Sequence, residues 1–179
     1  MSDPTTPSDA PSDSAPSGQQ RTHTFIWDDP MPLAEAARRM SGLAFWRAIF
    51  GGELPPPPIA IALGFRGAEV GEGRIVFALQ PAEYHYNPLG VVQGGLPAAV
   101  LDAAMGSAVH TTLPAGVGYT TLEIKINFIR AITIETGELR AEGSVIHAGG
   151  RTATAQGRLT DAAGKLYAHG TTTCIILRP

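Results

Sequence analysis

One acidic side chain interrupts a long apolar segment in the middle of the chain. Residues 96–109, LPAAVLDAAMGSAV, contain only Asp102 and Ser107 as polar residues, which is typical of a helix buried on every side. No cation lies three or four residues from Asp102, so nothing on this helix neutralises it. An isolated buried carboxylate is costly and is kept where chemistry uses it. Asp102 is therefore a candidate catalytic acid; the alternatives are a narrow exposed face or an arginine partner from a strand.

A glycine-rich segment, residues 86–95 with the sequence YNPLGVVQGG, leads into this helix. The first N–H groups of a helix are unpaired, and the helix dipole is positive there. Gly94 and Gly95 have no side chain that would block a ligand oxygen, so this end can polarise a carbonyl or hold an oxyanion. Gln93 and Asn87 add amide hydrogen-bonding groups. The alternative is an ordinary glycine-rich start of a helix.

The spacing of these two features constrains any shared site. Gly94 and Asp102 are eight residues apart, which is about 12 Å along one helix at 1.5 Å per residue. A carbonyl bound at Gly94 is therefore out of reach of Asp102 on the same helix. Either the two features are unrelated, or the site is composite and Asp102 comes from a second copy of the chain. A two-fold dimer with antiparallel helices would form two such sites.

The segment before the glycine-rich loop predicts helices. Residues 31–50 form a helical pattern that breaks near Ser41-Gly42, and Pro55 to Pro58 predict a stiff connector before a short helical turn at 59–63. Asp28 or Asp29 is a candidate N-cap. The apolar stripe of this segment is expected in a core or an interface; it comprises Leu43, Trp46, Ile49 and Phe50.

Strand patterns surround the one long helix, which is expected at 94–112. They lie near residues 65–70, 73–80, 119–130, 137–147, 150–160 and 165–177. Runs of strands with one interposed helix favour an α+β fold, in which an antiparallel sheet wraps over that helix.

The chain has 179 residues, which favours one domain with a sizeable core. We divide it into a disordered tail (1–22), an N-terminal helical extension with a Pro-rich connector (23–57) and a main domain (58–179). The tail is predicted because the first twenty residues are rich in Ser, Pro and Asp and contain no Lys or Arg.

Charge and composition exclude several classes of partner. The net charge is −3, from 13 Lys and Arg against 16 Asp and Glu, and the basic residues are scattered, which disfavours nucleic-acid binding. The single cysteine, Cys174, excludes an intrachain disulfide and a thiolate zinc site. No segment has the length of a membrane span, and the N-terminus is unlike a signal peptide. We therefore expect a soluble cytoplasmic protein without membrane contact.

Other common catalytic patterns do not occur. The five histidines are scattered without a metal-binding motif, so no metal is expected. Ser107 lies in the sequence Met-Gly-Ser-Ala-Val, which is not a nucleophile elbow. Nucleotide-binding glycine motifs are absent, so no nucleotide cofactor is expected.

The motifs NPLGVVQGG, residues 87–95, and LDAAMG, residues 101–106, form a pair. Together they resemble the signature of hotdog-fold acyl-CoA thioesterases of the phenylacetic-acid-degradation (PaaI-type) branch, Asn-x-x-Gly-x-x-His-Gly-Gly with an acidic residue two turns into the helix. The resemblance covers roughly residues 58–177, including TTLEIKINFIRA at 120–131. It implies a hotdog fold, in which a sheet of about six strands wraps the helix. It also implies a homodimer paired edge to edge, and a dimer of dimers.

The resemblance implies a role for each motif residue. Gly94 donates its N–H to the thioester carbonyl, and Asn87 positions the substrate or the water. Asp102 of the facing subunit is the nucleophile or the general base, and Thr121 matches a Ser or Thr near that carboxylate. Position 93 departs from the pattern, because Gln93 replaces the usual His, and an amide does not titrate near neutral pH.

A second region carries candidate substrate-binding residues. Residues 147–152, HAGGRT, predict a hairpin turn. In the resembled family this region lies near the nucleotide end of coenzyme A, so His147, Gly150 and Arg151 are candidates for binding it. Arg130, at the end of its predicted strand, is a similar candidate.

Three functions are compatible with these residues. The first is hydrolysis of acyl-CoA-type thioesters, with no cofactor beyond the coenzyme A of the substrate. The second is a non-catalytic protein that binds acyl-CoA or another hydrophobic ligand, which is favoured by the Gln93 departure and by an apolar helix that could line a tunnel. The third is a hotdog hydratase, which is disfavoured because no His follows Asp102 at a suitable spacing. The acyl length and any aryl preference stay open.

Overall fold

The computed structural model describes residues 18–178, and residues 1–17 and 179 lie outside the described part. Most of the expected disordered tail, residues 1–22, therefore falls outside it. Residues 18–22 have neither helix nor strand.

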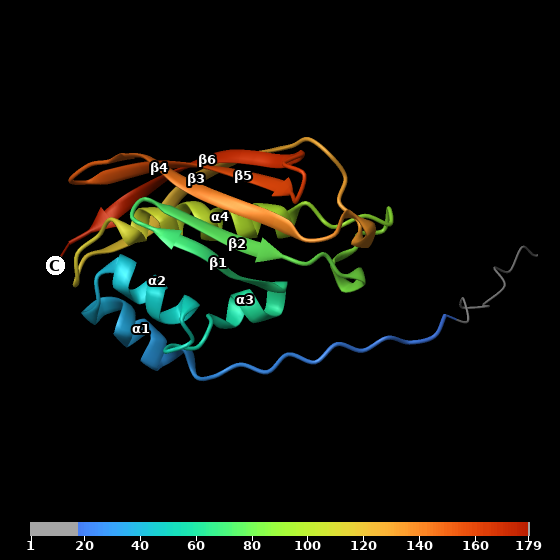
Figure 1. Cartoon of the computed structure of the whole chain (residues 1–179), viewed down its shortest axis with the longest axis horizontal. Helices are drawn as coiled ribbons and strands as arrows, with labels where there is room; N and C mark the ends of the chain where they lie inside the picture. Colours follow the sequence, from blue (N-terminus) through green and yellow to red (C-terminus); the bar gives the residue numbers. More distant parts are fainter. Residues whose placement is uncertain (1–17, 179) are drawn as a thin grey trace, which may run out of the picture.

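One antiparallel sheet forms the body of the molecule (Figure 1). Its strands are β1 (Phe65–Gly71), β2 (Arg74–Leu79), β3 (Gly118–Phe128), β4 (Leu139–Ala148), β5 (Thr152–Asp161) and β6 (Leu166–Leu177). The strand order is β1-β2-β4-β5-β6-β3, and every neighbouring pair is antiparallel. The six predicted strands are confirmed, and the predicted turn at 147–152 joins β4 to β5.

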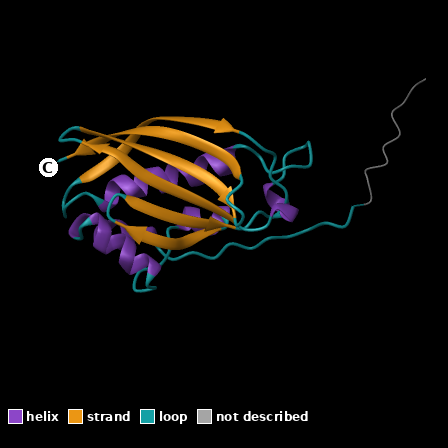
Figure 2. Cartoon of the chain, turned by 45° about the horizontal axis from the view of Figure 1, so that its top comes forward, coloured by secondary structure: helices purple, strands orange, loops and turns teal. Residues whose placement is uncertain are grey.

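Helix α4 (Gly95–Thr111) lies against one face of this sheet (Figure 2), and twelve of its 17 residues are buried. The sheet wraps it closely because small residues meet it there. A Cβ atom at Gly143 of β4 would lie 2.2 Å from the carbonyl oxygen of Ala104, so only glycine permits this approach. The expected α+β hotdog architecture, with one long helix in an antiparallel wrap, is confirmed.

Three short helices precede the sheet: α1 (Pro30–Arg39), α2 (Gly42–Phe50) and α3 (Pro58–Leu63). Asp29 is the N-cap of α1, and its side chain accepts a hydrogen bond of 2.9 Å from the N–H of Met31. Ser41 caps α2, so the predicted break between two helices is confirmed. Gly64, with φ of 71°, ends α3 in the left-handed region that favours glycine.

Helix α2 packs on α4 and on β1. Its buried side chains include Phe45, Trp46 and Ala48, whereas Leu43 and Phe50 are only half-buried. The predicted stripe is therefore correct for Trp46, which is in the core, and for Ile49 and Phe50, which pack against it. It omits Phe45, whose ring packs against His110 of α4 at 5.5 Å between centroids. Within residues 18–178 no helix is long and apolar enough to cross a membrane.

Candidate active site

The N-terminal end of α4 has unpaired donors. Gly94 is the N-cap, with helical φ and ψ of −58° and −23°. Its carbonyl accepts a hydrogen bond of 3.2 Å from Ala98, but the N–H groups of Gly94 and Gly95 have no acceptor among the described residues. Two donors at the positive end of a helix are therefore available to a ligand oxygen.

The loop before α4 is held by its own backbone and by one asparagine. The Oδ1 atom of Asn87 accepts hydrogen bonds from the N–H of Leu89 at 2.9 Å and of Val91 at 3.4 Å. The N–H of Val92 donates to the carbonyl of Ile132 at 2.9 Å. The side-chain oxygen of Asn87 thus shapes the loop, and only its amide nitrogen is left for the substrate role that the resemblance implies.

Gln93 and His85 meet through the backbone at the base of the same loop. The N–H of Gln93 donates to the His85 carbonyl at 2.8 Å, and the side chain of Gln93 is exposed. The His85 ring is buried, and its Nδ1 accepts from the N–H of Ala82 at 3.0 Å. Burial, with the nearby His23 adding, lowers the pKa of His85, so this ring stays neutral near neutral pH.

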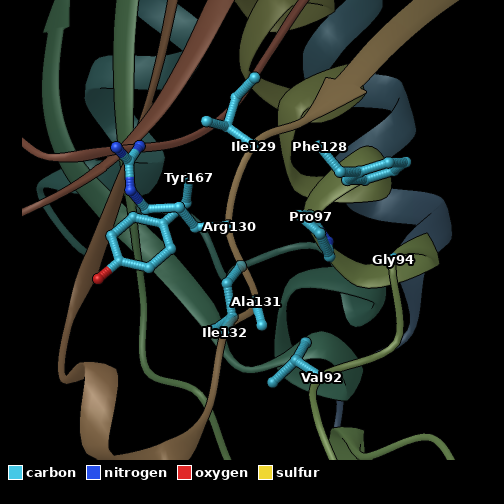
Figure 3. A pocket seen from close by; sticks show the side chains of 9 residues that line it. All are labelled: Val92, Gly94, Pro97, Phe128, Ile129, Arg130, Ala131, Ile132 and Tyr167. Atoms are coloured by element: carbon cyan, nitrogen blue, oxygen red, sulfur yellow. The ribbon is translucent and has the colours of Figure 1, made fainter. Parts of the chain in front are cut away.

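A cavity of about 280 Å³ opens beside Gly94. Figure 3 shows Phe128 and Pro97 beside Gly94 on one side of it and Tyr167 and Arg130 on the other. Its lining is completed by a short apolar set: Val92, Ile129, Ala131 and Ile132. The cavity is therefore mostly apolar, with Gly94, the N-cap of α4, at one side and one guanidinium at its rim.

Arg130 is the cation of this cavity. Its side chain is exposed and donates a hydrogen bond to the carbonyl of Leu166. This contact fixes the guanidinium at the rim, where its other N–H groups can meet an anion.

Asp102 lies half-buried on α4, so the expectation of a fully buried carboxylate is wrong within one chain, and the alternative of a narrow exposed face is closer to what is observed. Asp102 has one side-chain partner. The hydroxyl of Thr121 on β3 donates to Asp102 Oδ1 at 2.9 Å. No ion pair involves Asp102 within the described part of the chain, so the alternative of an arginine partner is wrong. A half-buried carboxylate with one hydroxyl donor is available for chemistry on its exposed side.

The groups around this carboxylate are neutral. Cys174 pairs with Thr121 in the β3–β6 register and is fully buried, and Tyr119 packs on α4 beside Gly106. Burial chiefly, with the Asp102 charge adding, raises the pKa of the Cys174 thiol and of the Tyr119 hydroxyl. Both side chains are therefore neutral at neutral pH.

The sheet register separates two groups of candidate residues. Thr121 of β3 aligns with Cys174 of β6, which in turn aligns with Ala153 of β5. Phe128 lies seven residues after Thr121, roughly 20 Å further along β3, and aligns with Ala168 of β6. Gly94 and Arg130 lie at the Phe128 end, and Asp102 lies at the Thr121 end. One chain therefore does not bring Gly94 and Asp102 together.

The hairpin residues belong to the Thr121 end. Residues 149–151 join β4 to β5 just beyond Ala153, which is aligned with Cys174 and, through it, with Thr121. His147, Gly150 and Arg151 are all exposed there, and the Gly150 carbonyl accepts from Arg178 Nε at 3.2 Å. Within one chain they are far from Gly94 and Arg130.

Part of this site was not expected from the sequence. Phe128, Ile132 and Tyr167 line the cavity beside Gly94, although the strand pattern gave no reason to single them out. Their one signal is position: Phe128 and Ile132 lie around the end of the strand predicted at 119–130, and Tyr167 lies near the start of the strand predicted at 165–177. In residues 18–178 no cluster of three or more His, Cys, Asp or Glu side chains could hold a metal ion.

Comparison with known proteins places this geometry in a family. A family model described as Thioesterase superfamily matches residues 89–168, which include Gly94, Asp102 and Tyr167. A phenylacetic acid degradation-related protein from Ralstonia eutropha JMP134 is 30% identical, with a TM-score of 0.66 over 73% of this chain and 98% of that one. The chain belongs to the thioesterase superfamily.

Other solved structures agree with this membership. The phenylacetic acid degradation protein PaaI from Thermus thermophilus, solved as a mutant, is 26% identical, with a TM-score of 0.61 over 69% of this chain and 100% of that one. A protein from Streptococcus mutans UA159 bound to acetyl-CoA is 21% identical, with a TM-score of 0.59 over 65% of this chain and 92% of that one, and shows the shared fold. A search of curated proteins gave no match. The PaaI-type hotdog resemblance is thus confirmed for this thioesterase superfamily member.

Proposed function

We propose that this thioesterase superfamily protein hydrolyses acyl-CoA-type thioesters at a site built from two copies of the chain. The observation that carries the proposal is the division of one chain into two half-sites. One half-site has the free N–H groups of Gly94 and Gly95 beside a cavity, and the other has Asp102 held by Thr121. Each half-site lacks what the other supplies.

The chemistry follows from the two halves. Attack on the thioester carbonyl builds negative charge on its oxygen, and the N–H groups at Gly94 and Gly95 stabilise that charge by about 2.7–4 kcal/mol for each well-placed donor. The Asp102 carboxylate either attacks the carbon itself or takes a proton from the attacking water. The C–S bond then breaks, and the thiolate leaves and takes up a proton as free thiol. On the first route the acyl group is then held by Asp102 as an anhydride, which a water molecule cleaves to release the acid and restore the carboxylate; on the second route the water oxygen becomes part of the acid directly.

The sheet edges support a two-copy arrangement. Strand β3 is an edge strand, and its side chains Leu122 and Ile124 are 57% and 38% exposed. The opposite edge strand, β1, is packed by α2 and α3. An uncovered apolar edge strand is a ready surface for pairing. Antiparallel pairing of β3 with its copy would set the Thr121 end of one chain beside the Phe128 end of the other.

The same pairing would gather the candidate coenzyme A contacts. Arg130 lies at the Phe128 end of one chain, and the hairpin with His147, Gly150 and Arg151 lies at the Thr121 end of its copy. We propose that these residues flank one site and that the guanidinium groups bind phosphate. The Streptococcus mutans structure, which holds acetyl-CoA on this fold, supports this class of ligand.

The test is release of free thiol from a panel of acyl-CoA substrates by the purified protein. We expect hydrolysis, and we expect Asp102→Asn and Asp102→Ala to lower kcat/KM at least ~100-fold. Glu72→Gln, which changes an exposed turn carboxylate in the same way, is the matched control and should retain the rate.

Two results would overturn the proposal. An unchanged rate in both Asp102 variants removes the carboxylate from the mechanism. If acyl-CoA protects the protein thermally but no member of the panel releases thiol, the result would instead favour a non-catalytic binding protein. Gln93, which is exposed and replaces the usual His, favours that alternative.

A further inference from the structure

A second cavity, of about 260 Å³, lies between the N-terminal helices and the main sheet. We call it the α2–α3 cavity and define it by Trp46, Phe50, Ile59, Phe65, Phe77 and Ala103, which all line it. It reaches α4 only at Ala103, the residue after Asp102. We infer that this cavity holds the acyl group of the substrate, and that its volume sets the acyl length that the protein accepts.

The first support is continuity with the carboxylate. In residues 100–111 of α4, only Asp102 and Ala103 are half-buried, and every other residue is buried. The carboxylate and the cavity therefore adjoin neighbouring, incompletely covered positions of α4. This inference rests on the proposed thioester chemistry, because it takes Asp102 as the position of the reacting carbon.

The second support is the chemistry of the walls. The rings of Trp46 and Phe65 each meet Phe77 edge to face, at 5.7 Å and 5.2 Å between centroids. Arg66 stands at the rim, but its guanidinium is paired with Glu138 at 2.7 Å and is 68% exposed. No carboxylate lines this cavity. The walls therefore suit an uncharged apolar group and disfavour an acyl group with a charged end.

The third support is volume. Protein interiors hold few voids larger than a water molecule, so an apolar space of this size is large enough to admit a ligand group. An apolar cavity of about 150 Å³ binds benzene, and scaling from its six carbons gives room for about ten carbons here. The cavity thus fits a straight chain of medium length or a ring on a short linker, and a long fatty chain exceeds it.

The fourth support is the rigidity of the walls, because a cavity limits the length of an acyl chain only if its walls do not move apart. The ring of Phe50 presses on the backbone of Gly67, where a Cβ atom would lie 2.4 Å from the ring. Pro56 and Pro57 form part of the wall, and their fixed backbone angles limit how far it can yield. A wall of this kind resists expansion around a longer chain.

The experiment compares kcat/KM for straight-chain acyl-CoA substrates of 2 to 16 carbons and for phenylacetyl-CoA. We expect a rise to about ten carbons and a fall beyond it. Ala103→Leu fills the helix side of the cavity and should lower the ratio of octanoyl to acetyl kcat/KM at least ~10-fold. Phe50→Ala enlarges the cavity and should move the optimum to longer chains. Met31→Ala, at an exposed apolar position of α1, is the control.

A binding experiment tests the role of the cavity separately from the proposed hydrolysis. Non-hydrolysable S-alkyl-CoA thioethers of 2, 8 and 16 carbons are titrated calorimetrically into the wild type and both cavity variants. If no substrate is hydrolysed, the proposed function fails, and the thioether affinities still decide the role of the cavity. A chain-length dependence that neither Ala103→Leu nor Phe50→Ala alters, in hydrolysis or in binding, overturns the inference. A phenylacetyl rate above every straight chain would identify the occupant as a ring.

Discussion

Asp102 accepts a single side-chain hydrogen bond, from the hydroxyl of Thr121. A carboxylate that must attack or accept a proton needs a fixed orientation, and one hydroxyl on a neighbouring strand provides it without a positive charge that would weaken the base. Thr121 is therefore a positioning residue, and the neutral Cys174 and Tyr119 beside it leave the charge of Asp102 uncompensated on that side.

Replacing this hydroxyl tests the assignment. Thr121→Val keeps the shape of the side chain and removes the donor. A hydrogen bond to a charged group contributes about 1.5–3 kcal/mol, so kcat should fall about 10- to 100-fold while KM changes little. Thr121→Ser restores the donor and should recover most of the rate. Equal loss in both variants would mean that packing, and not the hydrogen bond, matters at this position.

A substitution at Gly94 can separate an effect on the stability of the protein from an effect on its activity. Its backbone angles are helical, and a Cβ atom would meet the ring of Phe128 at 3.4 Å, a contact that the ring can accommodate. Gly94→Ala should therefore leave the melting temperature unchanged or slightly raised. It should still lower kcat/KM, because the new methyl group would stand at the cavity, next to the unpaired N–H of Gly94.

The matched control for Gly94→Ala is Gly71→Ala. Gly71 ends β1, and a Cβ atom there would meet nothing within 4 Å. Both variants are measured for melting temperature and for thiol release. Retained activity in Gly94→Ala would contradict a role for this end of α4 in binding the carbonyl oxygen.

At the scale of elements, α4 carries a buried titratable group as well as the candidate site. His110 is 7% exposed in the last turn and packs between Phe45 and Tyr119, with ring centroids 5.5 Å and 5.4 Å away. Burial lowers the pKa of His110 from its usual value of 6.5. The folded protein thus binds this proton less readily than the unfolded chain does, and stability present above about pH 6.5 is lost as the pH falls through the folded pKa.

Replacing His110 by phenylalanine, whose ring has no titrating nitrogen, should remove part of the loss of stability at acid pH. We expect the melting temperature of the wild type to drop between pH 7.5 and pH 5.5, and we expect a smaller drop for His110→Phe. Differential scanning calorimetry at the two pH values measures both drops. An equal drop would assign the acid sensitivity to other groups, His85 among them, whose pKa burial also lowers.

Elements with a repeating pattern could be predicted from the sequence, and elements without one could not. The apolar helix α4, the two helices divided at Ser41 and all six strands have such patterns, and each was expected near its observed place. The 3-10 helices at Glu83–His85 and Ile134–Thr136 are three residues long and carry no periodicity. They form because the chain turns between longer elements that tertiary packing has fixed.

The candidate site was predictable only in part for a related reason. Asp102 was recognisable because a charge stands out locally in an apolar helix. The cavity beside Gly94 joins α4 to Phe128 and Tyr167, which are 34 and 73 residues away in the sequence. Such contacts depend on strand order and register, and short sequence patterns do not encode these.

At the scale of the whole molecule, the two sheet edges differ in a way that bears on assembly. The α2 and α3 helices pack on β1, whereas β3 exposes Leu122, Ile124 and Phe128. We propose that β3 pairs with β3 of a second copy. Leu122→Lys combined with Ile124→Lys should then give a folded monomer in analytical ultracentrifugation. That monomer should have lost thiol release, because neither half-site is complete alone. An active monomer would rule out the two-copy site.

Mixing two inactive variants tests the composite site directly. Asp102→Ala removes the carboxylate, and Gly94→Val blocks the N–H end of α4, so each variant alone should be inactive. In a mixed dimer, one of the two sites combines the intact Gly94 of one chain with the intact Asp102 of the other. If the chains assort at random, half of the dimers are mixed and each has one working site, so about a quarter of the wild-type activity should return on refolding the variants together. If both residues served a site within one chain, every site would contain one defect, and mixing would restore nothing.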